Sequence, residues 1–246
     1  MSAVRDGDGH DKRADVPAVA DVAGLALVGL LQLADSSFPS GSFTLSGGLE
    51  TLVADGIVRD VEGIIEVVQV SLASRLALAD LPALMGVMTT EPVRVVAIDR
   101  RLLTTKLARE ERDGACRVGR RLVAEATLVE PSSALLSFQR SIEAAETPGT
   151  SAVAFGLAAA AFGVGPREAA SAAASGFVMG QALAAVRLAL IGHRGAQLVI
   201  RGCGAAIVAA VDVAAARDPL DPRPSTPGLD IALARHETAQ VRMFAS

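Results

Sequence analysis

Apolar residues recur at the spacing of an α-helix along nearly the whole chain, and no segment alternates β-branched with polar residues as a half-buried strand does. The apolar residues are mainly Ala, Leu and Val, whereas aromatic residues make up only 3% of the sequence and include no Trp or Tyr. Small side chains let helices approach closely, while sheets usually recruit aromatic and β-branched residues. The sequence therefore predicts an all-α fold.

Capping and helix-breaking residues divide this pattern into roughly ten helices. Asp60 is placed to cap a helix with an apolar face, and Gly56 stands where the preceding helix should end in a left-handed turn. Pro39 ends the first helix, because proline cannot donate a backbone hydrogen bond inside a helix. The expected helices cover residues 23–34, 46–54, 61–72, 81–89, 93–126 (as two helices or one bent helix), 132–145, 151–162, 166–191 and 195–216.

Composition changes at both ends divide the chain into four parts. Residues 19–216 should form a single-domain helical bundle, since a chain of 246 residues that is 51% hydrophobic can bury a large core. Residues 1–18 mix acidic and basic side chains, which predicts a flexible, disordered N-terminal tail and no signal peptide. Residues 217–228 are a proline-rich linker, and residues 229–246 are expected to form a C-terminal helical arm.

The overall charge and the cysteines exclude several classes of protein. A net charge of −4 argues against a nucleic-acid-binding protein. Cys116 and Cys203 lie far apart without a CxxC partner, as expected of reduced thiols in a cytoplasmic protein. The uncharged stretch 169–186 is long enough to span a membrane, but its Ala, Ser and Gly content and Gln181 favour a buried helix of a soluble protein. A helical membrane-associated protein is the weaker alternative.

The chain offers few residues for catalysis or metal binding. His193 and His236 have no His or Cys partner at a metal-ligand spacing, so we expect no metal site within one chain, although a site shared across a symmetry axis stays open. No serine lies in a G-x-S-x-G elbow, and no glycine-rich segment carries the Lys-Ser/Thr of a phosphate-binding loop. We therefore expect neither an enzyme nor a bound cofactor.

The segment from residue 30 to residue 50 combines a Pro/Gly/Ser loop with scarce aromatic residues. Phe38 and Phe43 flank its turn, and each either closes the core or serves as an exposed interface anchor. Glu50 is either an acid favoured by the dipole of a helix first turn or a charged contact to a partner. These residue types suit recognition better than reaction.

The C-terminal segment places charged residues beside Met243 and Phe244 after the flexible linker. Its charged residues are Arg235, His236, Glu237 and Arg242. Such a segment is typical of one that orders upon binding a partner. The alternative is a helix that docks on its own bundle.

Three blocks of the chain resemble one family, urease accessory protein F (UreF). The first block matches a P-x-G-x-F-x-x-S-x-G-L-E signature, the second is 153–190, and the third matches a D-x-A-x-x-R-H-E-x-x-x-x-R-L-F ending. The matching residues are Pro39, Gly41, Phe43, Ser46, Gly48, Leu49 and Glu50 in the first block, Arg187 in the second, and Asp230, Ala232, Arg235, His236, Glu237, Arg242 and Phe244 in the third.

This resemblance implies an all-helical homodimer in urease maturation that is not itself an enzyme. Together with the accessory protein UreD (also called UreH) it would recruit the GTPase UreG to the urease apoprotein for nickel insertion. The residues implied for UreD binding are Phe38, Pro39, Gly41, Phe43, Ser46, Gly48, Glu50, Arg235, His236, Glu237, Arg242 and Phe244. Gln181 and Arg187 would lie on the dimer or GTPase surface. An alternative is a strict GTPase-activating protein in which Arg187 or Arg242 supplies charge to the transition state.

Overall fold

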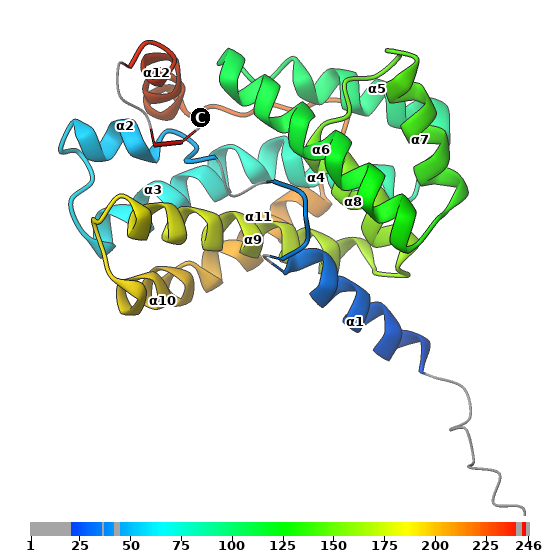
Figure 1. Ribbon diagram of the computed structural model, residues 1–246, viewed down its shortest axis with the longest axis horizontal. Helices are drawn as coiled ribbons and strands as arrows, with labels where there is room; N and C mark the ends of the chain where they lie inside the picture. The colour runs from blue at the N-terminus through cyan, green and yellow to red at the C-terminus, as the bar shows by residue number, and fades with distance from the viewer. Residues whose placement is uncertain (1–20, 36, 42–44, 240–242, 245–246) are drawn as a thin grey trace, which may run out of the picture.

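The computed structural model describes residues 21–35, 37–41, 45–239 and 243–244, and these residues contain α-helices and no strand (Figure 1). The prediction of an all-α fold is confirmed. The helices are α1 (Val22–Ala34), α2 (Leu49–Ala54), α3 (Val61–Ser74), α4 (Asp80–Val87), α5 (Pro92–Leu103), α6 (Arg109–Val129), α7 (Ser133–Glu143), α8 (Ser151–Ala161), α9 (Pro166–Arg187), α10 (His193–Gly202), α11 (Gly204–Ala215) and α12 (Pro227–His236), with a short 3-10 helix, η2 (Leu76–Leu78).

Helix α9 runs through the middle of the bundle and packs against α3, α4, α8, α10 and α11. Its small residues allow this crowding, and its buried positions are Ala169, Ala170, Ala174, Val178, Gln181, Ala182, Ala184 and Ala185. A glycine likewise allows α8 and α4 to approach each other closely. A Cβ on Gly156 of α8 would lie 2.4 Å from the carbonyl oxygen of Leu84 in α4.

By length and composition, α9 is the one single helix in the described part of the chain that is apolar enough to cross a membrane. The bent pair α10 and α11 would qualify only if it formed one span. Since α9 is surrounded by other helices of the bundle, its apolar character is that of a core helix. The fold therefore gives no indication of a membrane protein.

Local capping signals in the sequence placed several helix ends correctly. The Asp60 side chain accepts a hydrogen bond from the Gly63 N–H at 2.9 Å and so caps α3. Gly56 adopts φ +67° after α2, as expected of a left-handed turn. The charged region 93–126 forms two separate helices, which was one of the two alternatives.

Other helix boundaries differ from the expected ones. The first turn of the expected helix 46–54 is absent, because Gly47 and Gly48 adopt φ +60° and +91°. The region 195–216 forms two helices, α10 and α11, which meet at Cys203 with a bend of 42°. Helix α9 stops at Arg187, shortly before Ala189 turns to φ +55°.

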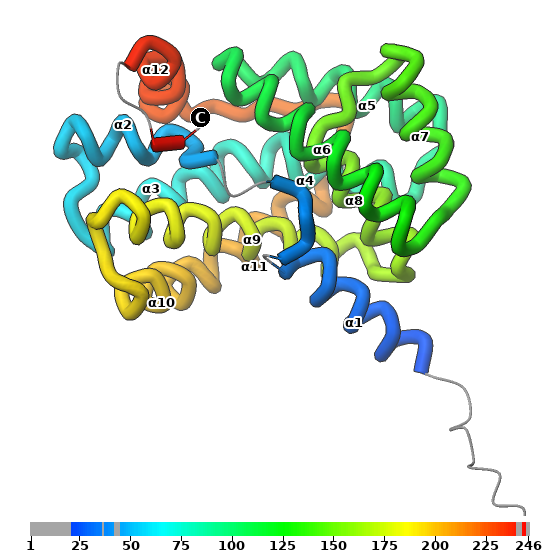
Figure 2. The backbone as a smooth tube through the Cα atoms, viewed as in Figure 1, coloured from blue at the N-terminus to red at the C-terminus, as the bar shows by residue number. Residues whose placement is uncertain are grey.

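The proline-rich segment, residues 217–226, crosses the bundle as a strap between α11 and α12 (Figure 2). It has no helix, as predicted, but its backbone is held in place. The N–H groups of Arg223 and Ser225 donate to the carbonyl oxygens of Leu78 and Ser74 at 3.0 and 2.9 Å. Helix α12 begins at Pro227, inside the predicted linker, because proline is favoured in a first helical turn.

Helix α1 contacts α8 and α9 and projects from the rest of the bundle (Figure 1). Its buried residues are Leu33 and Gly29, and a Cβ on Gly29 would clash with the ring of Phe162. Most of its large apolar side chains are exposed, namely Val22, Leu25, Leu27, Val28 and Leu31. The helix therefore buries little of its apolar surface against its own chain.

Candidate functional site

The two segments singled out in the sequence, near residue 48 and near residue 236, lie against each other in the structure. Helix α12 packs on α2 and on α6. Gly48, the N-cap of α2, faces α12. A Cβ added to Gly48 would lie 3.5 Å from Cγ of Leu233 and 3.6 Å from Cβ of Ala232, which is ordinary van der Waals contact. Of the two alternatives for the C-terminal segment, the structure shows the helix docked on its own bundle. Its role in partner binding stays a prediction.

Glu50, in the first turn of α2, receives the end of the chain. Its carboxylate accepts hydrogen bonds from the backbone N–H groups of Met243 at 2.7 Å and Phe244 at 3.2 Å, and lies 3.0 Å from Nε2 of His236. Partial burial raises the pKa of Glu50. The Met243 N–H, the His236 side chain and the Phe244 N–H together lower this pKa by more than burial raises it, so it lies below its ordinary value. The ionised carboxylate is therefore the form that holds the C-terminal segment.

His236 is buried between two carboxylates, with only 1% of its surface exposed. Its Nε2 faces Glu50 and its Nδ1 lies 2.7 Å from Oε2 of Glu110, in the first turn of α6. We name these three residues the Glu50–His236–Glu110 triad. It connects α2, α12 and α6 at one point, with both ring nitrogens of the histidine engaged.

Glu237 caps helix α6 from a distant part of the chain. The N-cap residue of α6 is Ala108, which has no side chain to accept the first N–H groups of the helix. Oε1 of Glu237 accepts instead from the N–H groups of Arg109 at 2.6 Å and Glu110 at 3.3 Å. The negative carboxylate also lies at the favourable end of the helix dipole.

Arg235 pairs with the other end of α2. Its guanidinium contacts both carboxylate oxygens of Asp55, the C-cap residue of α2, at 2.5 and 3.1 Å. Because the arginine side chain is largely exposed, we expect this pair to orient α12 more than to stabilise it.

The remaining predicted partner residues are divided between the core and the surface. Phe38 is buried and closes the core under the loop, and Ser46 is also buried. Pro39 is exposed, and Gly41 adopts φ +78° with open space beside it. Phe43 and Arg242 lie outside the described residues.

Gln181 and Arg187, both on α9, also lie against these segments. The Arg187 guanidinium stands over the ring of Phe244, 4.5 Å from its centroid, and Phe244 is buried. The amide of the buried Gln181 lies beside Gly47, where a Cβ would come within 2.9 Å of Nε2. The assignment of both residues to a dimer or GTPase surface stays a prediction.

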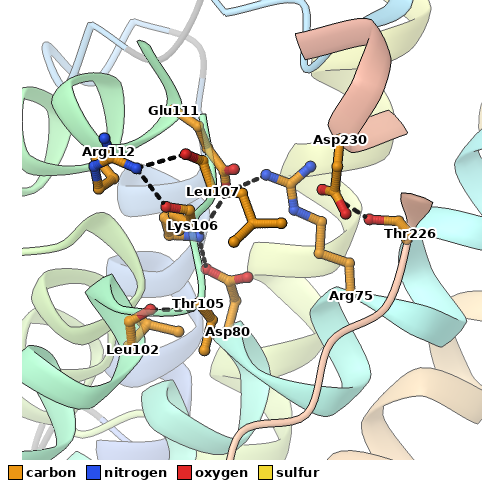
Figure 3. A network of polar contacts seen from close by, with 10 residues as sticks. All are labelled: Arg75, Asp80, Leu102, Thr105, Lys106, Leu107, Glu111, Arg112, Thr226 and Asp230. Carbon is orange, nitrogen blue, oxygen red and sulfur yellow. Dashed lines mark hydrogen bonds and ion pairs between the residues drawn. The ribbon is translucent and has the colours of Figure 1, made fainter. Parts of the chain in front are cut away.

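A buried ionic cluster next to α12 gave no signal in the sequence (Figure 3). Lys106 Nζ lies 2.9 Å from Asp80 and 3.3 Å from Glu111, and Glu111 also pairs with Arg75. Burial lowers the pKa of Lys106, but the two carboxylates raise it more, so that the lysine stays charged. The cluster borders a cavity of about 250 Å³ whose other wall is formed by the strap and by Asp230 of α12.

The side chains of this site contact one another within the chain. Both nitrogens of His236 face carboxylates in the interior, so that neither is directed at a substrate. Among the residues that the structure describes, no group of three or more His, Cys, Asp or Glu side chains is arranged to hold a metal ion. The contacts of these side chains hold the end of the chain against α2, α6 and α9.

Comparison with known proteins identifies the family of this chain. The UreF family model matches residues 58–204. The chain is 34% identical over 217 residues to urease accessory protein UreF of Paenarthrobacter aurescens (strain TC1), covering 88% of this chain and 96% of that protein. It is 30% identical over 224 residues to urease accessory protein UreF of Bacillus sp. (strain TB-90), covering 89% and 99%. The chain therefore belongs to the UreF family of urease accessory proteins.

Proposed function

We propose that this protein is a cytoplasmic adaptor in urease maturation. As a homodimer it binds UreD (UreH), and together they recruit the GTPase UreG to the urease apoprotein and support GTP-dependent nickel insertion. The observation that carries this proposal is the contact between two motif segments 186 positions apart, in which Nε2 of His236 lies 3.0 Å from the carboxylate of Glu50. Membership in a family of urease accessory proteins supports partners in urease maturation, and the contact between the two segments supports a binding site for a partner there.

The apolar surface of α1 supports a partner of this kind. Single exposed apolar residues are common, but a whole helix with exposed Val and Leu side chains marks an interaction site. Helix α1 leads directly into the loop that contains Phe38 and Pro39. One partner, UreD, would then cover α1 and also contact the loop that contains Phe38 and Pro39.

Binding of a purified UreD-type partner to single-residue variants tests this proposal. Leu31 of α1 and Leu198 of α10 are matched, since 63% and 62% of their surfaces are exposed. We expect Leu31→Asp to weaken binding at least tenfold in calorimetry and Leu198→Asp to leave it unchanged, with both variants folded by circular dichroism. Equal affinity of the two variants would remove α1 from the partner surface.

The alternative of a strict GTPase-activating protein receives less support from the site. An arginine that completes a GTPase transition state must reach out to the nucleotide. Arg187 lies instead over the ring of Phe244, and Arg242 is outside the described residues. Single-turnover GTP hydrolysis by UreG separates the two functions. The adaptor predicts no change with Arg187→Ala, whereas the alternative predicts a large loss of rate.

A further inference from the structure

The polar cavity beneath the strap has no role in the function proposed above. It has a volume of about 250 Å³ and lies between the buried ionic cluster, the strap and α12, and Figure 3 shows the residues around it. Sites for drug-sized ligands measure about 300–1,000 Å³, so this cavity suits a smaller molecule. Its rim is open to solvent, because 67% of Leu107 and 72% of the Arg223 side chain are exposed.

The walls of the cavity are fixed by contacts within the chain. On one side, Nζ of Lys106 lies 2.9 Å from Asp80 and 3.3 Å from Glu111. On the other side, the backbone N–H groups of Arg223 and Ser225 hold the strap on η2 and α3. A ligand that enters therefore meets groups that are already in position, which lowers the ordering cost of binding.

Arg75 offers hydrogen-bond donors to the cavity. Its guanidinium has five N–H groups, and Glu111 is the one side chain in the described part of the sequence with which it pairs. Burial lowers the pKa of Arg75. The carboxylates of Glu111, Asp80 and Asp230 together raise this pKa by more than burial lowers it, so the guanidinium stays charged. The donors that Glu111 leaves unused form a fork that matches a carboxylate.

Asp230, on the facing wall, offers hydrogen-bond acceptors. It lies in the first turn of α12, half-buried, with its carboxylate directed toward Arg75 (Figure 3). It forms no ion pair with Arg75 or with any other residue that the structure describes, and its one side-chain partner there is the Thr226 hydroxyl at 3.4 Å. A half-buried carboxylate without an opposite charge in contact is suited to an ammonium group.

We propose that the cavity beneath the strap binds a small zwitterion, an aliphatic α-amino acid. The carboxylate of the ligand accepts hydrogen bonds from the unused N–H groups of Arg75, and its ammonium group donates to Asp230. A simple anion leaves Asp230 without a donor, and a simple cation leaves the donors of Arg75 without an acceptor. This binding goes beyond the proposed function and is a property of the isolated chain.

The rest of the cavity lining favours an aliphatic side chain on the ligand. Its apolar members are Ala79, Leu107, Pro222 and Pro224. The other two cationic groups of the lining, Lys106 and Arg223, are already paired with acids of the chain. A charged ligand side chain would therefore compete with existing ion pairs, whereas an aliphatic one packs against the prolines.

Calorimetric titration of the full-length protein with L-leucine and two analogues tests the charge requirement. Isocaproate is leucine without the ammonium group, and isoamylamine is leucine without the carboxylate. We expect L-leucine to bind at least about tenfold more tightly than either analogue, because each analogue loses charge-assisted hydrogen bonds to Asp230 or Arg75. No binding of L-leucine at millimolar concentration, or equal affinity for the three compounds, would overturn the proposal.

The variant Asp230→Asn tests the assignment of the ammonium site. Asparagine keeps the size of the side chain and an oxygen for the Thr226 hydroxyl, but it loses the negative charge. We expect the affinity for L-leucine to fall at least about tenfold and the preference over isocaproate to disappear. Asp218→Asn changes an exposed acid of the strap outside the cavity lining, and it should leave the affinity unchanged.

Amide chemical shifts of the native protein locate the ligand without any variant. The amides of Arg223 and Thr226, which line the cavity, should shift when L-leucine is added. The amide of Gly63, at the other end of α3, should not. Unchanged strap amides, or native affinity for L-leucine in Asp230→Asn, would refute the site. If Asp230→Asn does not fold, the strap amides and the two analogues decide. Loss of the proposal would leave the adaptor function untouched, since no partner takes part in these measurements.

Discussion

Replacing Glu237 with Ala removes the carboxylate that caps helix α6, and we expect it to loosen two distant parts of the chain together. The N–H groups of Arg109 and Glu110 lose their acceptor at 2.6 and 3.3 Å, and Ala108 offers no substitute. At the same time the end of α12 loses one of its contacts to the body. The first turn of α6 and the C-terminal segment should therefore open more often.

The magnitude follows from capping and helix-dipole energies. Loss of an N-cap acceptor costs about 1 kcal/mol, and loss of a negative charge near a helix N-terminus costs about 0.3–1 kcal/mol. The two contributions overlap, since the same carboxylate provides both. We therefore expect a local destabilisation of about 1–2 kcal/mol, which corresponds to roughly 5- to 30-fold faster exchange at the amides of Arg109 and Glu110.

Two further variants make the measurement specific. Glu237→Gln keeps an acceptor oxygen but loses the charge, so we expect about half the effect. Glu130→Ala removes an exposed acid at the opposite end of α6, where the helix dipole disfavours negative charge, and should not speed exchange in the first turn. Native-like exchange at Arg109 and Glu110 in Glu237→Ala would refute the assignment of Glu237 as the cap.

Three further outcomes follow from buried groups. Gly119→Ala places a Cβ 2.2 Å from the carbonyl oxygen of Gly149, so urea denaturation should show a loss of about 1–3 kcal/mol, whereas Gly204→Ala, with open space, should cost nothing. Lys106→Met leaves the partly buried carboxylates of Asp80 and Glu111 without their lysine and should cost about 3 kcal/mol in the same assay. The pKa of Glu50 lies below its ordinary value, because burial raises it less than the hydrogen-bond donors lower it. Acid should therefore release the C-terminal segment only at a pH below the ordinary pKa of a glutamate, about 4.3. Amide exchange at Phe244 between pH 3 and 7 measures this release.

Features that depend on a few neighbouring residues could be predicted from the sequence. Asp60 caps α3 through the N–H of Gly63, only three residues away, and Gly56 turns the chain by its own φ angle. The helical spacing of apolar residues, which predicted the bundle, also depends only on residues that are close in sequence. The bend at Cys203 also has a local signal, because Gly202 and Gly204 flank it and glycine is a poor helix former, so the single helix expected over 195–216 divides there.

The contacts of the candidate site join residues that are far apart in sequence. Glu237 caps a helix 128 positions earlier, and Lys106 meets Asp80 across 26 positions. The motifs identified Glu50 and His236 separately, and only the fold shows that they touch. The sequence also cannot show that Phe38 is buried while Leu31 is exposed, since both are apolar residues of the same segment.

The three consecutive residues at the end of α12 explain why docking should be all-or-none. Successive residues of an α-helix point about 100° apart, so neighbouring side chains reach different elements. Arg235 contacts the end of α2, His236 lies between α2 and α6, and Glu237 caps the start of α6. A shift of α12 by one residue would break all three contacts at once. We therefore expect the three contacts to form and break together, so that a partner that favours another position of the segment would change all three at once.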